Sequence, residues 1–553
     1  MKTRRIGAFL LLLLIAGGIY AAAQTESVKK DVIVREQTLA GNAAAADGLS
    51  ASFGGYLSYG GLSWEHEYTY GGKQSTEFLD EAADGFESGL EGQDGRVELY
   101  TNFDFSSAYE LFCMDETAEG KNDRGNENTQ AEELLKAPFS DNAEAKFEQI
   151  GEKFSANQTK SLKIKVQDLL KYYIINGDIQ FAGRYSMLDF WMLKEYIGSS
   201  MDSEQQLEMK IWSDIQSFFK IPVLENEYQS VTMVYDPATG ELEHTETSES
   251  NGEKDDSFQF STVSCVTDEA AYFTFNPHTQ NGKLVDTSLI PGGYGIYRLP
   301  FDTKSGVPKT GELKMVYALD PNKEYNGIHA SPDGKKLFLT YYINDEINDG
   351  TEENAGSSDA EDEISVHIAA ELIDTASMSC DKKISVMEST KSQWIDRRDD
   401  GEYLLFADGS SQLVVYRYDA EKESYEEFLR LDGLDFDLPG LSALTDSRTK
   451  MYCEDGRIAF ASYEYVFYEE DEYIYWRYTG CVAAAVNVFT KDGHVYCGRL
   501  YSNLQDYYDR ESRRKIGDLL SKETEHGKTF ITDSKFRSYM QESYQSLGVK
   551  RAE

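Results

Sequence analysis

A short pattern recurs along this chain: an apolar strand ends in an aromatic or aliphatic residue followed by Asp, and a polar turn comes next. The copies are anchored at Asp104, Asp236, Asp302, Asp374, Asp419 and, more loosely, Thr490. One further copy near residue 170 would give seven units of about 64 residues each. Self-similarity at such a period in a strand-rich chain is typical of radial or stacked repeats, so it predicts an all-β body of consecutive small sheets.

A second repeated element lies between these strands. It is an Asp-Gly turn followed by a hydrophobic strand, and it occurs at 331–340, 398–406 and 453–460. Gly tolerates a positive φ and Asp caps its own backbone, so each copy predicts a tight turn. The run His329-Ala-Ser-Pro-Asp-Gly-Lys-Lys-Leu-Phe338, together with Ile296-Tyr297, resembles WD-repeat-like, TolB-type β-propellers. The resemblance covers about residues 230–500 and implies an architecture, not an activity.

The repeats and the resemblance favour an all-β fold with helical decorations. We expect a β-propeller of about seven four-stranded blades, with a range of roughly six to eight, over residues 51–502. The alternative is a β-sandwich or a two-domain β protein with Asp-Gly hairpins.

The length beyond a compact propeller is expected in helices near residues 165–220. Ser203–Phe219 reads as an amphipathic helix ended by Pro222, because one stripe of it is apolar. That stripe consists of Leu207, Ile211, Ile215 and Phe218. Further helical stretches are predicted at Gln167–Ile175 and within Ser186–Ile197, and the C-terminal segment 503–553 is also predicted to be helical.

Three other segments are predicted to lack a fixed structure. Residues 24–50 are polar and rich in Ala and Gly, which is typical of a flexible linker. Asp345–Glu363 contains nine acidic residues and no basic one, so it predicts a solvated, mobile loop. Thr117–Glu133 is a second segment of this kind.

The N-terminus has the features of an export signal. Basic residues precede Ile6–Ala23, a stretch of 18 residues without a charge. Residues 1–23 are therefore a cleaved signal peptide, with small residues at 21–23, or an uncleaved signal anchor, because an 18-residue helix spans roughly 27 Å. Either reading predicts an extracytoplasmic body, secreted or held at the cell membrane by residues 6–23, with the basic flank inside.

The charge of the chain limits its partners. There are 97 Asp and Glu against 54 Lys and Arg, a formal charge of −43, while 13% of the residues are aromatic. That aromatic content is too high for a disordered acidic chain. Nucleic acid is excluded as a partner because its binding depends on clustered Lys and Arg. Contact with a membrane is expected only through the N-terminal segment.

The cysteines show neither a disulfide framework nor a metal-ligand spacing. The six are Cys113, Cys265, Cys380, Cys453, Cys481 and Cys497. An Asp492-Gly493 hairpin turn would place Cys497 opposite Val488 and far from Cys481, so this pair is not expected to form a bridge. We interpret the cysteines as small buried residues and leave their pairing open.

A search for catalytic signatures identifies none. G-x-S-x-G, H-E-x-x-H, P-loop and G-x-G-x-x-G motifs are absent, and the seven His show no ligand spacing. Asp80–Glu91 matches an EF-hand loop only in part, since Ala82 and Glu87 stand where a ligand and an apolar anchor are needed. The sequence therefore nominates no catalytic, cofactor-binding or metal-binding residue.

These observations favour a non-enzymatic, extracytoplasmic β-propeller that binds a protein, a peptide or a cell-surface polymer. One alternative is a glycan-active hydrolase or lyase that uses carboxylates in the propeller channel. A second alternative is a membrane-anchored sensory or scaffold protein. The sequence specifies neither the ligand nor the oligomeric state.

Overall fold

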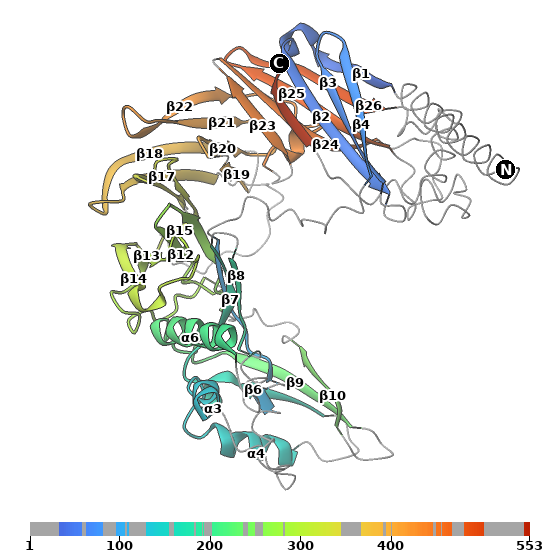
Figure 1. Ribbon diagram of the computed structural model, residues 1–553. Coiled ribbons are helices and arrows are strands. Elements are labelled where there is room, and N and C mark those ends of the chain that lie inside the picture. Colours follow the sequence, from blue (N-terminus) through green and yellow to red (C-terminus); the bar gives the residue numbers. More distant parts are fainter. Residues whose placement is uncertain are drawn as a thin grey trace, which may run out of the picture.

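The structure, a computed structural model, confirms the all-β class (Figure 1). It describes residues 33–57, 62–80, 96–105, 108–109, 129–153, 160–181, 184–190, 192, 202–235, 242–248, 258–279, 282–343, 366–390, 394–399, 401–445, 449–454, 456–466, 481–502 and 547–552. Within these ranges the strands form seven sheets, numbered 1 to 7 below, and every strand pair is antiparallel.

Three sheets in the middle of the chain are regular four-stranded meanders. Sheet 4 contains β11 (Thr262–Val266), β12 (Ala270–Phe275), β13 (Gly295–Pro300) and β14 (Lys314–Ala318). Sheet 5 contains β15 (Glu324–Ala330), β16 (Lys336–Ile343), β17 (Val366–Asp374) and β18 (Ser379–Ser389). Sheet 6 contains β19 (Asp396–Asp399), β20 (Tyr403–Ala407), β21 (Leu413–Asp419) and β22 (Ser424–Leu431). Each is the sequential four-stranded unit that the repeat predicts.

The two terminal sheets exchange strands. Sheet 7 contains β23 (Lys450–Glu454), β24 (Arg457–Val466), β25 (Cys481–Thr490), β26 (Gly493–Ser502) and, outside β26, the N-terminal strand β1 (Val34–Gly41). Sheet 1 contains β2 (Leu49–Leu57), β3 (Leu62–Thr69), β4 (Lys73–Asp80) and, beside β2, the C-terminal strand β27 (Leu547–Arg551). Each end of the described chain thus completes the sheet built by the opposite end, which ties sheets 1 and 7 together.

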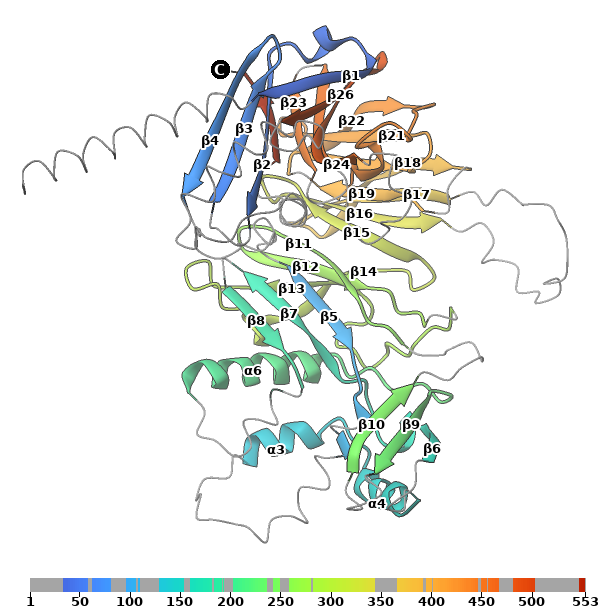
Figure 2. The same ribbon diagram turned by 90° about the vertical axis from the view of Figure 1, so that its right-hand side faces the viewer.

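The remaining strands and the helices form the other end of the molecule. Sheet 2 contains β5 (Val97–Thr101), β7 (Ile175–Phe181) and β8 (Arg184–Leu188). Sheet 3 contains β10 (Leu242–Ser248), β9 (Tyr228–Tyr235) and β6 (Lys160–Lys165), and lies near α3 (Thr129–Lys136) and α4 (Ala143–Lys153) in both views (Figures 1 and 2). Four short 3-10 helices within the described ranges are η1 (Ala43–Ala46), η3 (Val166–Asp168), η4 (Thr310–Glu312) and η5 (Leu441–Ala443).

Helix α6 (Ser203–Phe218) confirms the predicted amphipathic helix. Asp202 caps its start by accepting hydrogen bonds from the backbone N–H groups of Glu204 and Gln205, both at 2.9 Å. Ile211 and Ile215 of the predicted stripe are buried against the core shared by sheets 2 to 5.

Neighbouring sheets pack through apolar faces, and six of them follow an arc in the order 1, 7, 6, 5, 4, 2 (Figure 1). Separate apolar clusters join sheet 1 to 7, 7 to 6 and 6 to 5, and one large cluster joins sheets 5, 4 and 2 with sheet 3 and the helices. The first strands β15, β19 and β23 lie on the concave side of the arc.

The repeated motifs of the sequence are hydrogen-bonded turns. Asp302, Asp374 and Asp419 follow or end the third strand of sheets 4, 5 and 6 and accept backbone N–H groups of the next turn at 2.8 to 3.2 Å. The Asp-Gly elements join the first strand to the second, with Gly334, Gly401 and Gly456 at φ values of 69°, 77° and 81°.

The six sheets do not form a closed ring in the described residues, since sheets 1 and 2 lie apart at the two ends of the arc (Figure 1). One face of sheet 1 packs on sheet 7. Its opposite face carries a small hollow lined by Glu65, Glu67, Glu77 and Lys550, among others. Packing another sheet there would bury carboxylates, of which Glu67 alone has a lysine partner among the described residues, Lys550 at 3.2 Å. This charge gives a physical reason for the open end.

Several local predictions are wrong. Residues 24–50 were expected to form a linker, but Val34–Gly41 is β1, because the edge of β26 offers it a hydrogen-bonding partner. Gln167–Ile175 is not a helix beyond the 3-10 turn η3, because Leu170 and Tyr172 form isolated bridges to Phe139 and Pro222 and Ile175 begins β7. Ser186 lies in β8, which completes sheet 2. Leu547–Arg551 is strand β27 and not a helix.

Other predictions are corrected in part or lie outside the description. Thr117–Glu133 was expected to be a loop, but its last residues belong to α3. A β-bulge between Val488 and Phe489 places Cys497 opposite Asn487 and not Val488. The segments 1–23, 345–363 and 503–546 lie outside the described residues.

Candidate functional site

A cavity of about 700 Å³ lies where the first strands of sheets 2, 4, 5 and 6 converge. β5, β11, β15 and β19 all contribute to its walls, and the first turns of sheets 4, 5 and 6 contribute to its rim. Its volume lies within the range of sites for small molecules or short chain segments. The residues that carry charge or a titratable ring in its lining are Arg96, Glu98, Asp268, His329, Arg397 and Asp399.

Side chains of sheet 4 hold sheet 2 against one wall of the cavity. Ser264 Oγ accepts the backbone N–H of Val97 at 3.2 Å, and Thr262 Oγ1 accepts that of Leu99 at 3.2 Å. Thr262 Oγ1 also donates to the carbonyl of Val97 at 2.5 Å. These bonds satisfy backbone groups on the edge of β5 that would otherwise need water, so this wall is built from fixed polar groups.

Arg397 reaches across the cavity from β19 toward sheet 5. Its side chain lies so close to Gly327 of β15 that a Cβ there would be 2.6 Å from Arg397 Nε. Burial lowers the pKa of the Arg397 guanidinium, against the opposing influence of Tyr342 and Asp396. Within the described part of the chain, this guanidinium makes no hydrogen bond and no ion pair. A buried cation without a partner is rare, since buried charges are normally paired.

The other arginine of the lining is balanced by an acid. Arg96 forms an ion pair with Glu98 two residues along β5, and both side chains are more than one third exposed. Such an exposed pair contributes little to stability. The two arginines therefore differ, because Arg96 already has a carboxylate and Arg397 does not.

His329 and Asp399 form a polar pair between sheets 5 and 6. The His329 Nδ1 atom lies 3.2 Å from Asp399 Oδ2, and the backbone N–H of Gly401 donates to Asp399 Oδ1 at 3.0 Å. With a carboxylate beside Nδ1, the proton of a neutral ring lies on Nδ1 and Nε2 is left as an acceptor. His329 is 8% exposed, and its buried Nε2 atom has no hydrogen-bond partner among the residues that the structure describes.

Cys265 lines the same cavity, but its environment does not make it a nucleophile. Burial, and then the charge of Asp399, raise the pKa of the Cys265 thiol well above its usual range. A thiol of this kind stays protonated at neutral pH, whereas nucleophilic cysteines have a lowered pKa. The cavity is therefore chemically suited to binding and not to attack by sulfur.

The rim of the cavity is rigid where the Ser-Pro-Asp-Gly-Lys element forms it. Ser331 Oγ donates to Asp333 Oδ1 at 2.7 Å and accepts the backbone N–H of Lys336 at 3.0 Å. From sheet 6, the Tyr418 hydroxyl donates to the Asp333 carboxylate at 3.0 Å, and the Tyr425 hydroxyl donates to the Ala330 carbonyl at 3.3 Å. The motif therefore locks sheets 5 and 6 together beside the cavity.

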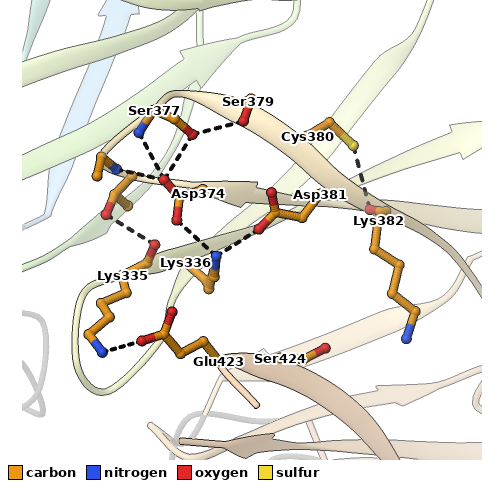
Figure 3. Close-up of polar contacts among 12 residues, drawn as sticks. Lys335, Lys336, Asp374, Ser377, Ser379, Cys380, Asp381, Lys382, Glu423 and Ser424 are labelled. Atoms are coloured by element: carbon orange, nitrogen blue, oxygen red, sulfur yellow. Dashed lines mark hydrogen bonds and ion pairs between the residues drawn. The ribbon is translucent and has the colours of Figure 1, made fainter. Parts of the chain in front are cut away.

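A second charged cluster, away from the cavity lining, is structural (Figure 3). The Lys336 side chain is 7% exposed and its Nζ donates to Asp374 at 2.8 Å and to Asp381 at 2.7 Å. Although burial lowers the pKa of Lys336, the hydrogen bonds to Asp374 and Asp381 raise it overall. This paired cation joins the last three strands of sheet 5 and leaves no charge for a ligand.

The sequence nominated no site residue, and the structure brings several residues together that it passed over. His329 begins the propeller-like motif, but the seven His show no ligand spacing and so gave no reason to select it. Asp399 lay in an Asp-Gly element and Arg397 stood just before it. His329, Arg397 and Asp399 share a position in the repeat: each lies at the end of a first strand or in the Asp-Gly turn that follows it, and these segments face the cavity. The EF-hand-like segment falls mainly on residues outside the description.

Among the described residues, no group of three or more His, Cys, Asp or Glu is arranged to hold a metal ion. None of the helices in the described ranges has the length and apolar character needed to span a bilayer, and residues 6–23 lie outside those ranges.

Comparison with known proteins identifies no family. No protein-family model and no curated protein matches the chain. Solved structures with similar segments include an acylaminoacyl peptidase of Pyrococcus horikoshii, with 11% identity over 50% of this chain and 36% of that chain and a TM-score of 0.21. This chain thus spans about a third of that peptidase.

Two further solved structures show likeness at a similar level. The β-propeller domain of Myceliophteria thermophila Cps50 (Swd1) matches at 8% identity over 49% of this chain and 81% of that chain, with a TM-score of 0.20. Porphyromonas gingivalis dipeptidyl peptidase 4 matches at 9% identity over 66% and 62%, with a TM-score of 0.20. TM-scores this low support no inference about architecture or activity.

Proposed function

We propose that this protein is a non-enzymatic binding protein that holds part of a protein, peptide or surface polymer in the cavity between sheets 2, 4, 5 and 6. The observation that supports it best is Arg397 on the wall of a polar cavity, a partly buried guanidinium that has no ionic partner among the described residues. A buried cation without a partner destabilises a fold, so selection for stability alone would remove it. A binding site can retain such a cation because an anionic ligand pairs with it.

The proposal includes an architecture and a location. The body is a β-propeller-type arrangement of six to eight blades, of which the arc contains six sheets. The protein acts outside the cytoplasm, released or held at the membrane by residues 6–23. N-terminal sequencing of the mature protein tests the location: a start after residue 23 supports release, a retained segment supports anchoring, and a retained segment on a protein found in the cytosol contradicts both.

The binding proposal is tested with an array that carries random decapeptides, folded proteins and purified polysaccharides. The full-length protein is compared with Asp268→Trp, which fills the rim because Asp268 is exposed and lines the cavity. Asp286→Trp is the matched control, since Asp286 is equally exposed but does not line the cavity. Signals that Asp268→Trp loses and Asp286→Trp keeps support the proposal. No signal, or signals equal in both variants, contradicts it.

A second candidate function, a glycan-active hydrolase or lyase, is favoured by one observation. The cavity combines the His329–Asp399 pair with two further carboxylates, Glu98 and Asp268. A carboxylate that orients a histidine ring is the arrangement of a general base. The test is turnover of a glycan panel by the wild-type protein and by His329→Gln. Turnover that His329→Gln abolishes without loss of folding would replace the non-enzymatic proposal.

A further inference from the structure

We infer that the ligand of the cavity is a peptide that presents a single carboxylate to Arg397. This inference rests on the proposed binding function and specifies the chemistry of its ligand. It follows from three features of the lining: one guanidinium that no described residue pairs with, a backbone surface that positions it, and acidic neighbours that limit the charge of the ligand.

The first feature is the number of negative charges of a ligand that the cavity can pair, which is one. Arg397 remains positively charged at any physiological pH, and its planar fork of N–H donors matches the two oxygens of a carboxylate. The neighbouring Arg96 already pairs with Glu98. One ligand carboxylate therefore completes the ion pairing of the cavity, and a second ligand anion would find no partner among the lining residues.

The second feature is the placement of Arg397 over Gly327. A side chain at position 327 would meet Arg397 Nε and Thr340 Oγ1, both at 2.6 Å, and Arg397 Cδ at 2.9 Å. The missing Cβ thus lets the arginine lie along β15, so that its side chain passes from sheet 6 to sheet 5. Gly327 acts as a positioning residue, because the space left by its missing side chain determines where the guanidinium lies, while Gly327 itself does not contact the ligand.

The third feature is the acidity around the guanidinium. Asp268 and Asp399 also line the cavity, and the whole chain has a formal charge of −43. A phosphate dianion or a polyuronate chain would bring several negative charges into this field, whereas a peptide carboxylate brings one.

A peptide also suits the neutral part of the lining. The cavity offers the hydroxyl groups of Thr267 and Ser331 and the first-strand edges of sheets 4 and 5, which suit the alternating donors and acceptors of a peptide backbone. The buried Nε2 of His329 is an unsatisfied acceptor beside the same cavity. These groups favour a peptide over a polymer of repeated carboxylates.

The experiment is equilibrium dialysis of the full-length protein against two mixtures of N-acetylated tripeptides without acidic side chains. The mixtures share their sequences and differ only at the C-terminus, which is a free acid in one and an amide in the other. Trigalacturonate in a third chamber represents a polyuronate. The bound fraction is read by mass spectrometry for the wild-type protein, Arg397→Gln, Arg397→Lys and Arg417→Gln.

Arg417 is the matched control because its ion pair with Glu402, at 2.7 Å, lies on the surface and outside the cavity. We expect the wild-type protein and Arg417→Gln to retain acids over amides by about tenfold or more. Arg397→Gln should bring that ratio close to one, and Arg397→Lys, which keeps the charge but loses the fork, should give a value in between. Circular dichroism confirms that each variant is folded.

Three results overturn the inference: an acid-to-amide ratio near one in the wild-type protein, an unchanged ratio in folded Arg397→Gln, or tighter retention of trigalacturonate than of the acid tripeptides. If array signals depend on Asp268 but the tripeptide ratio is one, the binding function stands and the peptide assignment fails. If neither assay detects binding through the cavity, the proposed function itself fails.

Discussion

Replacing Arg397 with Met should stabilise the protein in the absence of ligand. Most substitutions at partly buried positions cost stability, by about 1 kcal/mol on average, so the predicted sign is the unusual one. The guanidinium is desolvated by burial, and no described residue forms a hydrogen bond or an ion pair with it, although the charges of Tyr342 and Asp396 favour its charged form. Met keeps an unbranched apolar stem of similar reach and removes the charge.

The magnitude follows from the incomplete burial of the side chain. An isolated ion buried in a protein costs several kcal/mol after relaxation. Arg397 is only partly buried and Asp396 opposes the loss of charge, so we expect about 1 to 3 kcal/mol of added stability. The control Arg417→Met removes a surface pair with Glu402 and should cost less than about 1 kcal/mol.

Urea unfolding followed by circular dichroism measures the effect for the wild-type protein and both variants. A shift of the midpoint to higher urea at an unchanged slope reports a true gain in the free energy of unfolding. A folded Arg397→Met that loses more than about 1 kcal/mol would refute the reasoning, since the guanidinium would then be stabilising the fold through its own contacts.

Three further predictions concern other residues. Gly327→Ala should lower the acid-to-amide ratio of bound tripeptides at least about threefold, whereas Gly311→Ala, with nothing within 4 Å of its new Cβ, should leave it unchanged. Burial lowers the pKa of His66 from its usual value of 6.5 to about 3, so its contribution to stability is intact above pH 6.5 and is lost as the pH falls toward 3. His66→Phe should therefore flatten the decline of unfolding free energy between pH 7 and 5 by roughly 1 to 2 kcal/mol, and an unchanged decline contradicts the assignment. Asp374→Ala should cost about 2 to 4 kcal/mol because it removes one of two carboxylates from a buried lysine. Asp419→Ala, at a turn residue whose ion pair with Lys422 is more exposed, should cost clearly less, and equal losses would contradict the buried-pair account.

The repeated motifs could be interpreted correctly from the sequence because their chemistry is local. Asp302, Asp374 and Asp419 each bind backbone N–H groups two or three residues ahead, so a strand followed by Asp already predicts the turn. Helix α6 was predictable for the same reason, since its apolar stripe and its cap lie within about twenty residues.

Other elements depend on distant partners and were misread. The segment of β1 is polar and looks like a linker, and it is a strand only because β26, more than 450 residues later, offers an edge. β27 likewise forms on the edge of β2. Strands that complete a sheet in this way carry little pattern of their own, because the partner strand supplies the hydrogen bonds.

The sequence alone determined the β class, the consecutive sheets and the turn chemistry, since each of these follows from composition or from contacts along a few residues. Only the tertiary structure decided that the described sheets form an open arc, that each end of the described chain completes the opposite sheet, and that Arg397, beside His329 and Asp399, has no ionic partner among the described residues. Those features depend on contacts between residues that lie hundreds of positions apart in the sequence. Burial and ion pairing are set by such contacts, which a local sequence pattern does not show.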